Sequence, residues 1–335
     1  MFTIIRELFR DFEARGVRFV HWKSNVDLHK ALRGYDDLDI LVAPSQLQLA
    51  MIALRDHGLI EGTNSRIRFP NIFHFYGNDP ETGNLVHVHL YAEVITGSSW
   101  TKSYRFPWTD QILDTKVTHE SGMPVTAPHI EYSLYVIRAL AKSFSPVESL
   151  FTGSHSRIDP VELSYLADRM DRQALDEFVR DHFSCLSADQ LCAAAECLLT
   201  GGRLKSLRAA LSLSKACNRY RRHSRLVETA SIVGQLFWRT FHRLAGRGKK
   251  TPLTRTRFIA ITGLDASGKS TTTATIKQWL GSHFRTDLIH VGAPPSAWAT
   301  LPINWAIRCL RPLASGDVAN PGDTASDKPL SAVHA

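Results

Sequence analysis

Nine residues late in the sequence have the spacing of a phosphate-binding loop. Gly263 is followed by four residues and then by Gly268, Lys269 and Ser270, which fits the pattern GxxxxGK[ST]. Glycines let backbone N–H groups surround a phosphate, Lys269 brings a positive charge to it, and the Ser270 hydroxyl is placed to ligate Mg²⁺. The pattern predicts a binding site for a nucleoside triphosphate with Mg²⁺. Its residues are Gly263, Leu264, Asp265, Ala266, Ser267, Gly268, Lys269, Ser270 and Thr271.

The stretches on both sides of this loop have the character that such a loop requires. FIAIT, residues 258–262, is a short apolar run typical of a buried strand, and residues 269–284 favour a helix. A helix that begins at Lys269 directs the positive end of its dipole at a bound anion. DLIHVG, residues 287–292, predicts a second strand. This context favours a nucleotide site over a simple glycine turn.

The segment FIAITGLDASGKSTT resembles the thymidylate kinase group of P-loop nucleotide kinases, whose loop reads G-x-D/E-x-x-G-K-S-T after an apolar strand. The resemblance implies an α/β kinase domain that transfers a phosphoryl group from ATP to a nucleotide or a sugar-type acceptor. It implies catalytic roles for Asp265 and Lys269, with Asp265 facing the acceptor, and it lets Thr271 reach a donor phosphate. The alternative role of Asp265 is a local turn that hydrogen-bonds its own backbone.

Other features of that kinase group are missing from the sequence after Lys269. No Asp-Arg pair, no arginine-bearing lid and no acid directly after an apolar strand follow the loop. A doubly wound sheet needs about five strands, whereas residues 257–312 offer only FIAIT and DLIHVG. We therefore expect only the start of a kinase domain, in a chain truncated or frameshifted near Pro312. ATP binding by such a fragment is expected to be weak unless another chain completes the sheet.

A second group of residues with metal-binding chemistry lies in the N-terminal third. GYDDLDILV places Asp37 and Asp39 two residues apart on a predicted strand, so both carboxylates point to one face and can hold Mg²⁺ against a triphosphate. NLVHVHLY puts His87 and His89 on one face by the same period. Together the four side chains predict a mixed oxygen and nitrogen site that favours a transition metal over Mg²⁺. The alternatives are a polar sheet face, or a domain that binds a nucleotide or sugar phosphate without chemistry.

Residues 15–125 resemble the nucleotidyltransferase superfamily, in particular the minimal nucleotidyltransferase-like domains that are fused to P-loop kinase-like domains in bacterial surface-polysaccharide gene clusters. The resemblance rests on the aspartates 37 and 39 and on HWKSN followed by a short helix and a strand. That superfamily's turn is usually Gly-Ser or Gly-Gly, whereas this chain has KSN. Where the superfamily has a third carboxylate on a later strand, this chain has His87 and His89, and Glu93 is the residue that could compensate. The resemblance implies an alternative function, metal-dependent nucleotidyl transfer. A non-catalytic remnant or scaffold is the other alternative.

The elements that must position these groups fall into five segments. Residues 1–127 alternate helices and strands and predict an α+β nucleotidyltransferase-like domain, and residues 128–245 predict an all-α middle region. A basic linker is expected over 246–256 and the start of an α/β P-loop kinase domain over 257–312. A disordered tail rich in Ala, Ser, Gly, Asp and Pro is expected over 313–335.

Positive charge is concentrated in residues 203–257, which hold 15 Lys and Arg and one acid, Glu228, in a chain of net charge +8. An apolar helical stripe in this segment consists of Val233, Leu236, Phe237, Phe241 and Leu244. Packing of this stripe against a neighbouring domain is the preferred interpretation. Contact of the basic segment with an anionic membrane surface or another polyanion is the alternative, and no specific nucleic-acid readout is expected.

Composition points to an ordinary folded chain, with 44% hydrophobic and 21% charged residues. No apolar run approaches the roughly 18 residues that cross a bilayer, and the first residues lack the layout of a signal peptide. The five cysteines show no CxxC spacing and are expected to be reduced. We therefore expect a cytoplasmic protein, or one that is peripheral to the membrane through its basic segment.

Overall fold

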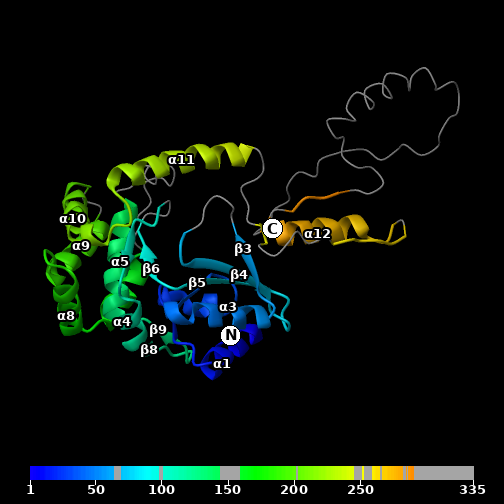
Figure 1. The fold of residues 1–335 in the computed structure, drawn as a ribbon, viewed down its shortest axis with the longest axis horizontal. Coiled ribbons are helices and arrows are strands. Elements are labelled where there is room, and N and C mark those ends of the chain that lie inside the picture. The colour runs from blue at the N-terminus through cyan, green and yellow to red at the C-terminus, as the bar shows by residue number, and fades with distance from the viewer. Residues whose placement is uncertain are drawn as a thin grey trace, which may run out of the picture. The chain divides into compact units, whose positions relative to one another are not determined.

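The computed structural model describes residues 1–63, 69–97, 101–143, 159–200, 203–244, 251–252, 259–264, 266–281, 284 and 286–289 (Figure 1). Asp265, most of the expected linker 246–256 and the expected tail 313–335 lie outside these residues. Residues 1–285 form one compact unit and residues 286–335 a second.

The main sheet is mixed and has eight strands within the described residues, in the order β10-β3-β4-β5-β2-β1-β9-β8. Its strands are β1 (Phe19–His21), β2 (Leu38–Val42), β3 (Ile60–Thr63), β4 (Ile72–Asn78), β5 (Leu85–Tyr91), β8 (Val117–Thr118), β9 (Pro124–Val125) and β10 (Thr251–Pro252). The pairs β2–β5 and β1–β9 are parallel, and the other neighbours are antiparallel. A separate two-stranded sheet pairs β6 (Val94–Thr96) with β7 (Tyr104–Phe106).

Helices account for most of the remaining described chain. They are α1 (Thr3–Ala14), α2 (Leu28–Ala31), α3 (Leu47–Asp56), α4 (Thr109–Asp114), α5 (Pro128–Ser143), α7 (Pro160–Arg169), α8 (Arg172–His182), α9 (Ala188–Thr200), α10 (Arg203–Ala216), α11 (Arg225–Leu244) and α12 (Lys269–Gly281), with 3-10 turns η1 (Asn25–Asp27), η2 (Pro44–Gln46) and η3 (Asn218–Tyr220). Aspartate side chains cap the first residues of α7 and α8. Asp159 accepts a hydrogen bond from the N–H of Val161, and Asp171 accepts one from the N–H of Gln173.

The first hydrophobic core lies between one face of the sheet and the helices α1 and α3. Strand alternation sends every second side chain of β5 into this core, namely Val86, Val88 and Leu90. They share one cluster with Phe12 of α1 and Leu54 of α3. The intervening residues of β5, His87 and His89, are therefore on the other face of the sheet.

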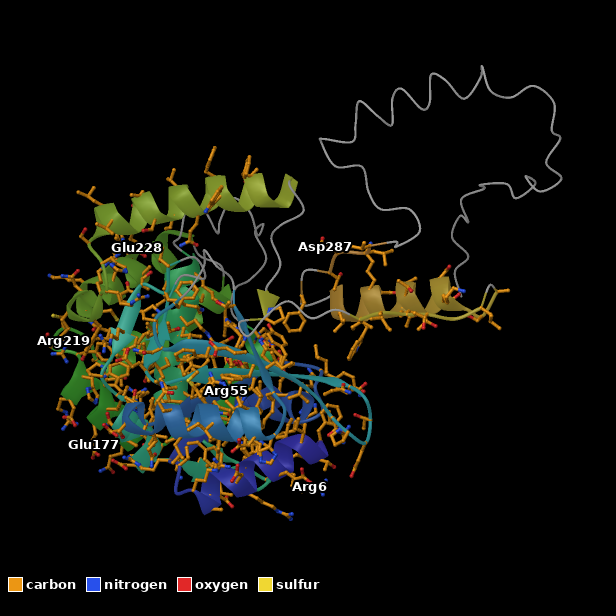
Figure 2. The ribbon with its side chains drawn as sticks, turned by 45° about the vertical axis from the view of Figure 1, so that its right-hand side comes forward. Arg6, Arg55, Glu177, Arg219, Glu228 and Asp287 are labelled. Atoms are coloured by element: carbon orange, nitrogen blue, oxygen red, sulfur yellow. The ribbon has the colours of Figure 1, made fainter. Side chains whose placement is uncertain are left out.

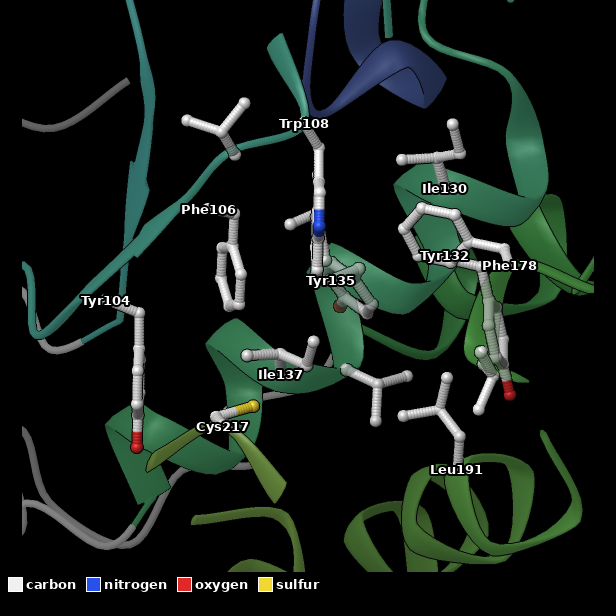
Figure 3. Packing of buried hydrophobic residues seen from close by; sticks show 14 of the residues in the cluster. Tyr104, Phe106, Trp108, Ile130, Tyr132, Tyr135, Ile137, Phe178, Leu191 and Cys217 are labelled. Atoms are coloured by element: carbon white, nitrogen blue, oxygen red, sulfur yellow. The ribbon is translucent and has the colours of Figure 1, made fainter. Parts of the chain in front are cut away.

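A second hydrophobic core joins the sheet to the helices that follow residue 127. Trp22 and Tyr91 belong to one cluster with apolar side chains of α5, α7, α8, α9 and α10. Figure 3 shows Trp108 in this cluster beside Phe106, and their rings stack with centroids 4.1 Å apart. The α+β class is confirmed, and α5 begins at Pro128, where the all-α region was expected. The nucleotidyltransferase-like and kinase-like assignments stay predictions.

Three side chains of the apolar stripe of α11 are exposed. Val233, Phe237 and Phe241 are 59%, 73% and 52% exposed. Packing of the stripe against a neighbouring domain stays a prediction. Contact with a membrane surface or a polyanion stays a prediction. No helix in the described ranges is long and apolar enough to cross a bilayer.

Polar contacts attach the first turns of α11 to the fold. Glu228 accepts hydrogen bonds from Thr101 at 3.1 Å, from Ser103 and from the guanidinium of Arg221. Figure 2 labels Glu228 where the start of α11 meets the fold beneath it. A carboxylate with three partners, one of them charged, is a strong anchor.

A buried polar chain links β1 to α5 next to the turn that follows β1. His21 Nδ1 donates to Asn25 Oδ1 at 2.6 Å, because the Asn25 amide nitrogen is committed to Glu131. Asn25 donates to the two Glu131 oxygens from its backbone N–H at 3.0 Å and from Nδ2 at 2.7 Å. Burial raises the pKa of Glu131 to about 7 despite these two bonds and lowers the pKa of His21.

The raised pKa of Glu131 predicts a pH-dependent stability. The folded chain retains a proton that the unfolded chain has lost, so the contribution of Glu131 is complete below its ordinary pKa of 4.5 and is lost as the pH rises through about 7. Because Gln does not titrate, the unfolding free energy of the wild type should fall by about 2 kcal/mol relative to that of Glu131→Gln when the pH is raised from about 5.5 to about 8. Urea unfolding of both proteins at the two pH values measures this change.

The charged groups that face Glu131 are Glu162, which raises its pKa, and Arg138, which lowers it. The comparison with Glu131→Gln cancels titrations elsewhere in the chain. A stability difference between the two proteins that stays constant with pH would contradict the raised pKa.

Candidate functional site

Polar side chains from three neighbouring strands share the face of the sheet opposite to α1 and α3. In the parallel pair β2–β5, Asp39 lies opposite His89, and in the antiparallel pair β4–β5, His74 lies opposite His89. Residues two apart point the same way, so Asp37 comes next to His87. The Asp–His cluster consists of Asp37, Asp39, His74, His87 and His89.

The two aspartates of the cluster each hold one histidine of β5. Asp37 Oδ1 lies 2.5 Å from His87 Nδ1, and Asp39 Oδ1 lies 3.2 Å from His89 Nδ1. The Lys23 ammonium lies 3.0 Å from the same Asp39 oxygen. The structure thus brings together the four residues that the sequence placed in one metal site, and it adds Lys23.

Both carboxylates of the cluster are held in the ionised form. Burial alone would raise the pKa of Asp37, but the hydrogen bond with His87 and the charge of His89 lower this pKa to about 2. Burial opposes ionisation of Asp39 too, but Lys23 and His89 hold the pKa of this carboxyl well below its usual range. Two carboxylates beside one lysine leave an excess of negative charge that attracts a cation.

The cluster does not fit a magnesium centre of the two-carboxylate type. Mg²⁺ requires oxygen ligands in near-octahedral geometry, whereas the Asp39 oxygen that faces the cluster is shared by Lys23 and His89. The compensating role expected for Glu93 is also wrong. Its carboxylate accepts from Asn71 Nδ2 at 2.7 Å and pairs with Arg105. Strand β5 ends at Tyr91, so the alternation on which that expectation rested stops before Glu93.

His74 is the member of the cluster that sequence reasoning missed. Its Nδ1 lies 3.2 Å from His87 Nε2. The sequence does carry a signal, because IFHFYG (residues 72–77) is rich in strand-forming residues and the turn-forming NDPETG (residues 78–83) joins it to the histidine strand, which indicates a hairpin. The register of that hairpin pairs Asn78 with Leu85 and so brings residue 74 opposite residue 89. A turn of this length does not fix the register from sequence alone.

Two lysines near the cluster were also not predicted as site residues. Lys23 precedes Ser24, whose φ of 57° is in the left-handed region. Ser24 thus occupies a turn position that favours glycine. Lys102 has a φ of 49°, and its burial together with repulsion from Lys23 lowers its pKa to about 7.

The phosphate loop is a separate candidate site, built from residues 263–264 and 266–271 in the described chain. Its backbone turns at Ala266 and Gly268, whose φ values are 65° and 81°, and α12 begins at Lys269. Lys269 Nζ donates to the backbone carbonyls of Gly263, at 2.8 Å, and of Leu264. Ser270 and Thr271, in the first turn of α12, are exposed. Asp265 lies outside the described residues.

The strands expected around this loop do not form among the described residues. Residues 259–262 and 286–289 have no strand pairing, and Ile259 is 60% exposed. A parallel strand needs hydrogen-bonding neighbours and helices on both faces, and the described chain provides none for these two segments. The helix expected after the loop is present as α12.

Comparison with known proteins leaves the function to be inferred from these residues. A scan against models of known protein families finds no match to this chain, and no curated protein matches it significantly.

Removal of Lys23 should destabilise the fold much more than removal of a surface lysine nearby. Lys23→Ala leaves the buried Asp39 carboxylate without its cation, which should cost about 3 kcal/mol of unfolding free energy. Lys30 pairs with Asp27 at 2.7 Å on the surface, so Lys30→Ala should have a much smaller effect on the unfolding free energy. Urea unfolding of both variants gives the comparison, and equal losses would argue against a structural role for the Lys23–Asp39 pair.

Proposed function

We propose that residues 263–271 bind the phosphates of ATP together with Mg²⁺, and that the chain is a phosphotransferase of the thymidylate kinase type. The observation that carries the proposal is the conformation of the loop before α12. Gly268 has a left-handed backbone, and the first residue of the helix, Lys269, folds its ammonium back onto the carbonyls at the start of the loop. The ammonium thus lies over the loop, where it would meet a bound phosphate.

The residues of the loop fit a phosphate ligand. A Cβ at Gly263 would come within 2.8 Å of Ser267 Oγ, so a larger residue there would close the loop. The N-terminus of α12 offers unsatisfied N–H groups and the positive end of a 13-residue helix. The Ser270 hydroxyl in its first turn would ligate Mg²⁺, which neutralises phosphate charge when bound.

The resemblance to thymidylate kinases supplies the roles in the proposed reaction. An oxygen of the acceptor forms a bond to the γ-phosphorus of ATP, while the bond from this phosphorus to the bridging oxygen breaks and ADP leaves. Lys269 stabilises charge on the donor phosphates, and Asp265 faces the acceptor, a nucleotide or a sugar-type compound. Nucleotidyl transfer at the Asp–His cluster has less support, because its carboxylates are committed to histidines and Lys23.

Lys269→Ala should weaken binding of ATP with Mg²⁺ by about 30-fold to 150-fold, since a hydrogen bond to a charged group contributes about 2–3 kcal/mol. Isothermal titration of the full chain measures the dissociation constant. Lys277→Ala is the matched control, because Lys277 is an exposed lysine two turns further along α12. Equal affinities of Lys269→Ala and the control would contradict a functional phosphate loop.

A further inference from the structure

Imidazole nitrogens from three histidines lie close together on the face of the sheet opposite to α1 and α3. His74 on β4 and His87 and His89 on β5 each offer one nitrogen, and these three nitrogens all lie within 4.8 Å of one another. His74 Nδ1 and His87 Nε2 are 3.2 Å apart. In tetrahedral coordination with Zn–N bonds of about 2.05 Å, ligand nitrogens are about 3.3 Å apart. One pair is thus already at coordination distance.

The two aspartates orient two of these histidines. Ionised carboxylates can only accept, so His87 Nδ1 donates to Asp37 and His89 Nδ1 donates to Asp39. With a proton kept on Nδ1, each ring can bind a metal ion through Nε2, because metal binding displaces any proton from that nitrogen. A carboxylate behind a histidine in this way is the arrangement that fixes metal-ligating imidazoles and raises their basicity.

His89 Nε2 has no hydrogen-bond partner among the described residues although it is buried. Its nearest charged neighbour is Asp37 Oδ2 at 3.5 Å, and an acceptor nitrogen gains nothing from a carboxylate oxygen. A buried polar atom without a partner is costly. A cation bound by His89 Nε2 and the two other imidazoles would give this nitrogen a partner.

We propose that His74, His87 and His89 bind one divalent transition-metal ion, with Zn²⁺ as the best fit, and that Asp37 and Asp39 orient the imidazoles. Three nitrogen ligands select Zn²⁺, Co²⁺ or Ni²⁺ over Mg²⁺ and Ca²⁺, which require oxygen. Three protein ligands also leave one coordination position free, which is the pattern of catalytic rather than structural zinc sites. The site is built from strands of the main sheet and is independent of the phosphate loop.

Zn²⁺ alone is the probe, added to the full chain after chelator treatment and measured by equilibrium dialysis with metal analysis. The wild type should bind one Zn²⁺ that is lost in His74→Ala and in His89→Ala. Asp37→Ala should weaken binding by about 10-fold to 100-fold, the usual effect of removing an orienting carboxylate. His29→Ala is the matched control, because His29 is exposed on α2, and it should bind as the wild type does. The wild type and His29→Ala should melt at a higher temperature with Zn²⁺, and His74→Ala and His89→Ala should not.

Unchanged Zn²⁺ binding in both His74→Ala and His89→Ala would overturn the proposal, as would the absence of a bound ion in the wild type. If these variants do not fold, Co²⁺ in the wild type decides instead. Strong visible absorption from a four-coordinate ion with nitrogen ligands is expected, and the faint spectrum of a six-coordinate oxygen shell would overturn the proposal. Lys269→Ala should keep its Zn²⁺, so the outcome is separate from that of ATP binding.

Discussion

The parallel pairing of β2 with β5 is the constraint on which the rest of the structure depends. It sets Asp39 beside His89, 50 positions further along the chain. Side chains alternate along both strands, so the same register sends Leu38 and Val88 into the core under α1 and α3. A slip of one residue would exchange the two faces and bury the carboxylates among apolar side chains. The hydrophobic core therefore enforces the geometry of the polar cluster.

The cluster is rigid because its charges are paired within a few ångströms at the border of a dry core. Tyr91, next in the row after His89, is buried in the second core and hydrogen-bonds Asp39, and burial holds the pKa of its phenol well above the usual value. Lys23 supplies the compensating cation from the turn after β1. That turn is itself fixed by the bonds from Asn25 to α5. Helices distant in sequence thus stabilise the face that carries the Asp–His cluster.

Local patterns predicted local features well and long-range pairing poorly. The period of two placed Asp37 and Asp39 on one face, and the glycine and lysine spacing located the turn at Gly268 and the start of α12 at Lys269. His74 depended on a hairpin register, which cross-strand packing decides. Glu93 was misplaced because a strand end depends on its partners and not on its own residues. The stripe of α11 has helical spacing that says which residues share a face but not what covers them.

The second hydrophobic core has a consequence for how the chain is divided. Trp22 and Tyr91 belong to the strand region, yet most other members of their apolar cluster lie on α5 and the elements after it. A fragment that stops at residue 127 would expose these aromatic rings to solvent as an apolar patch beside the Asp–His cluster. The strand region and the helical region therefore depend on each other, and any exchange of domains in evolution or in the laboratory has to keep the two regions together.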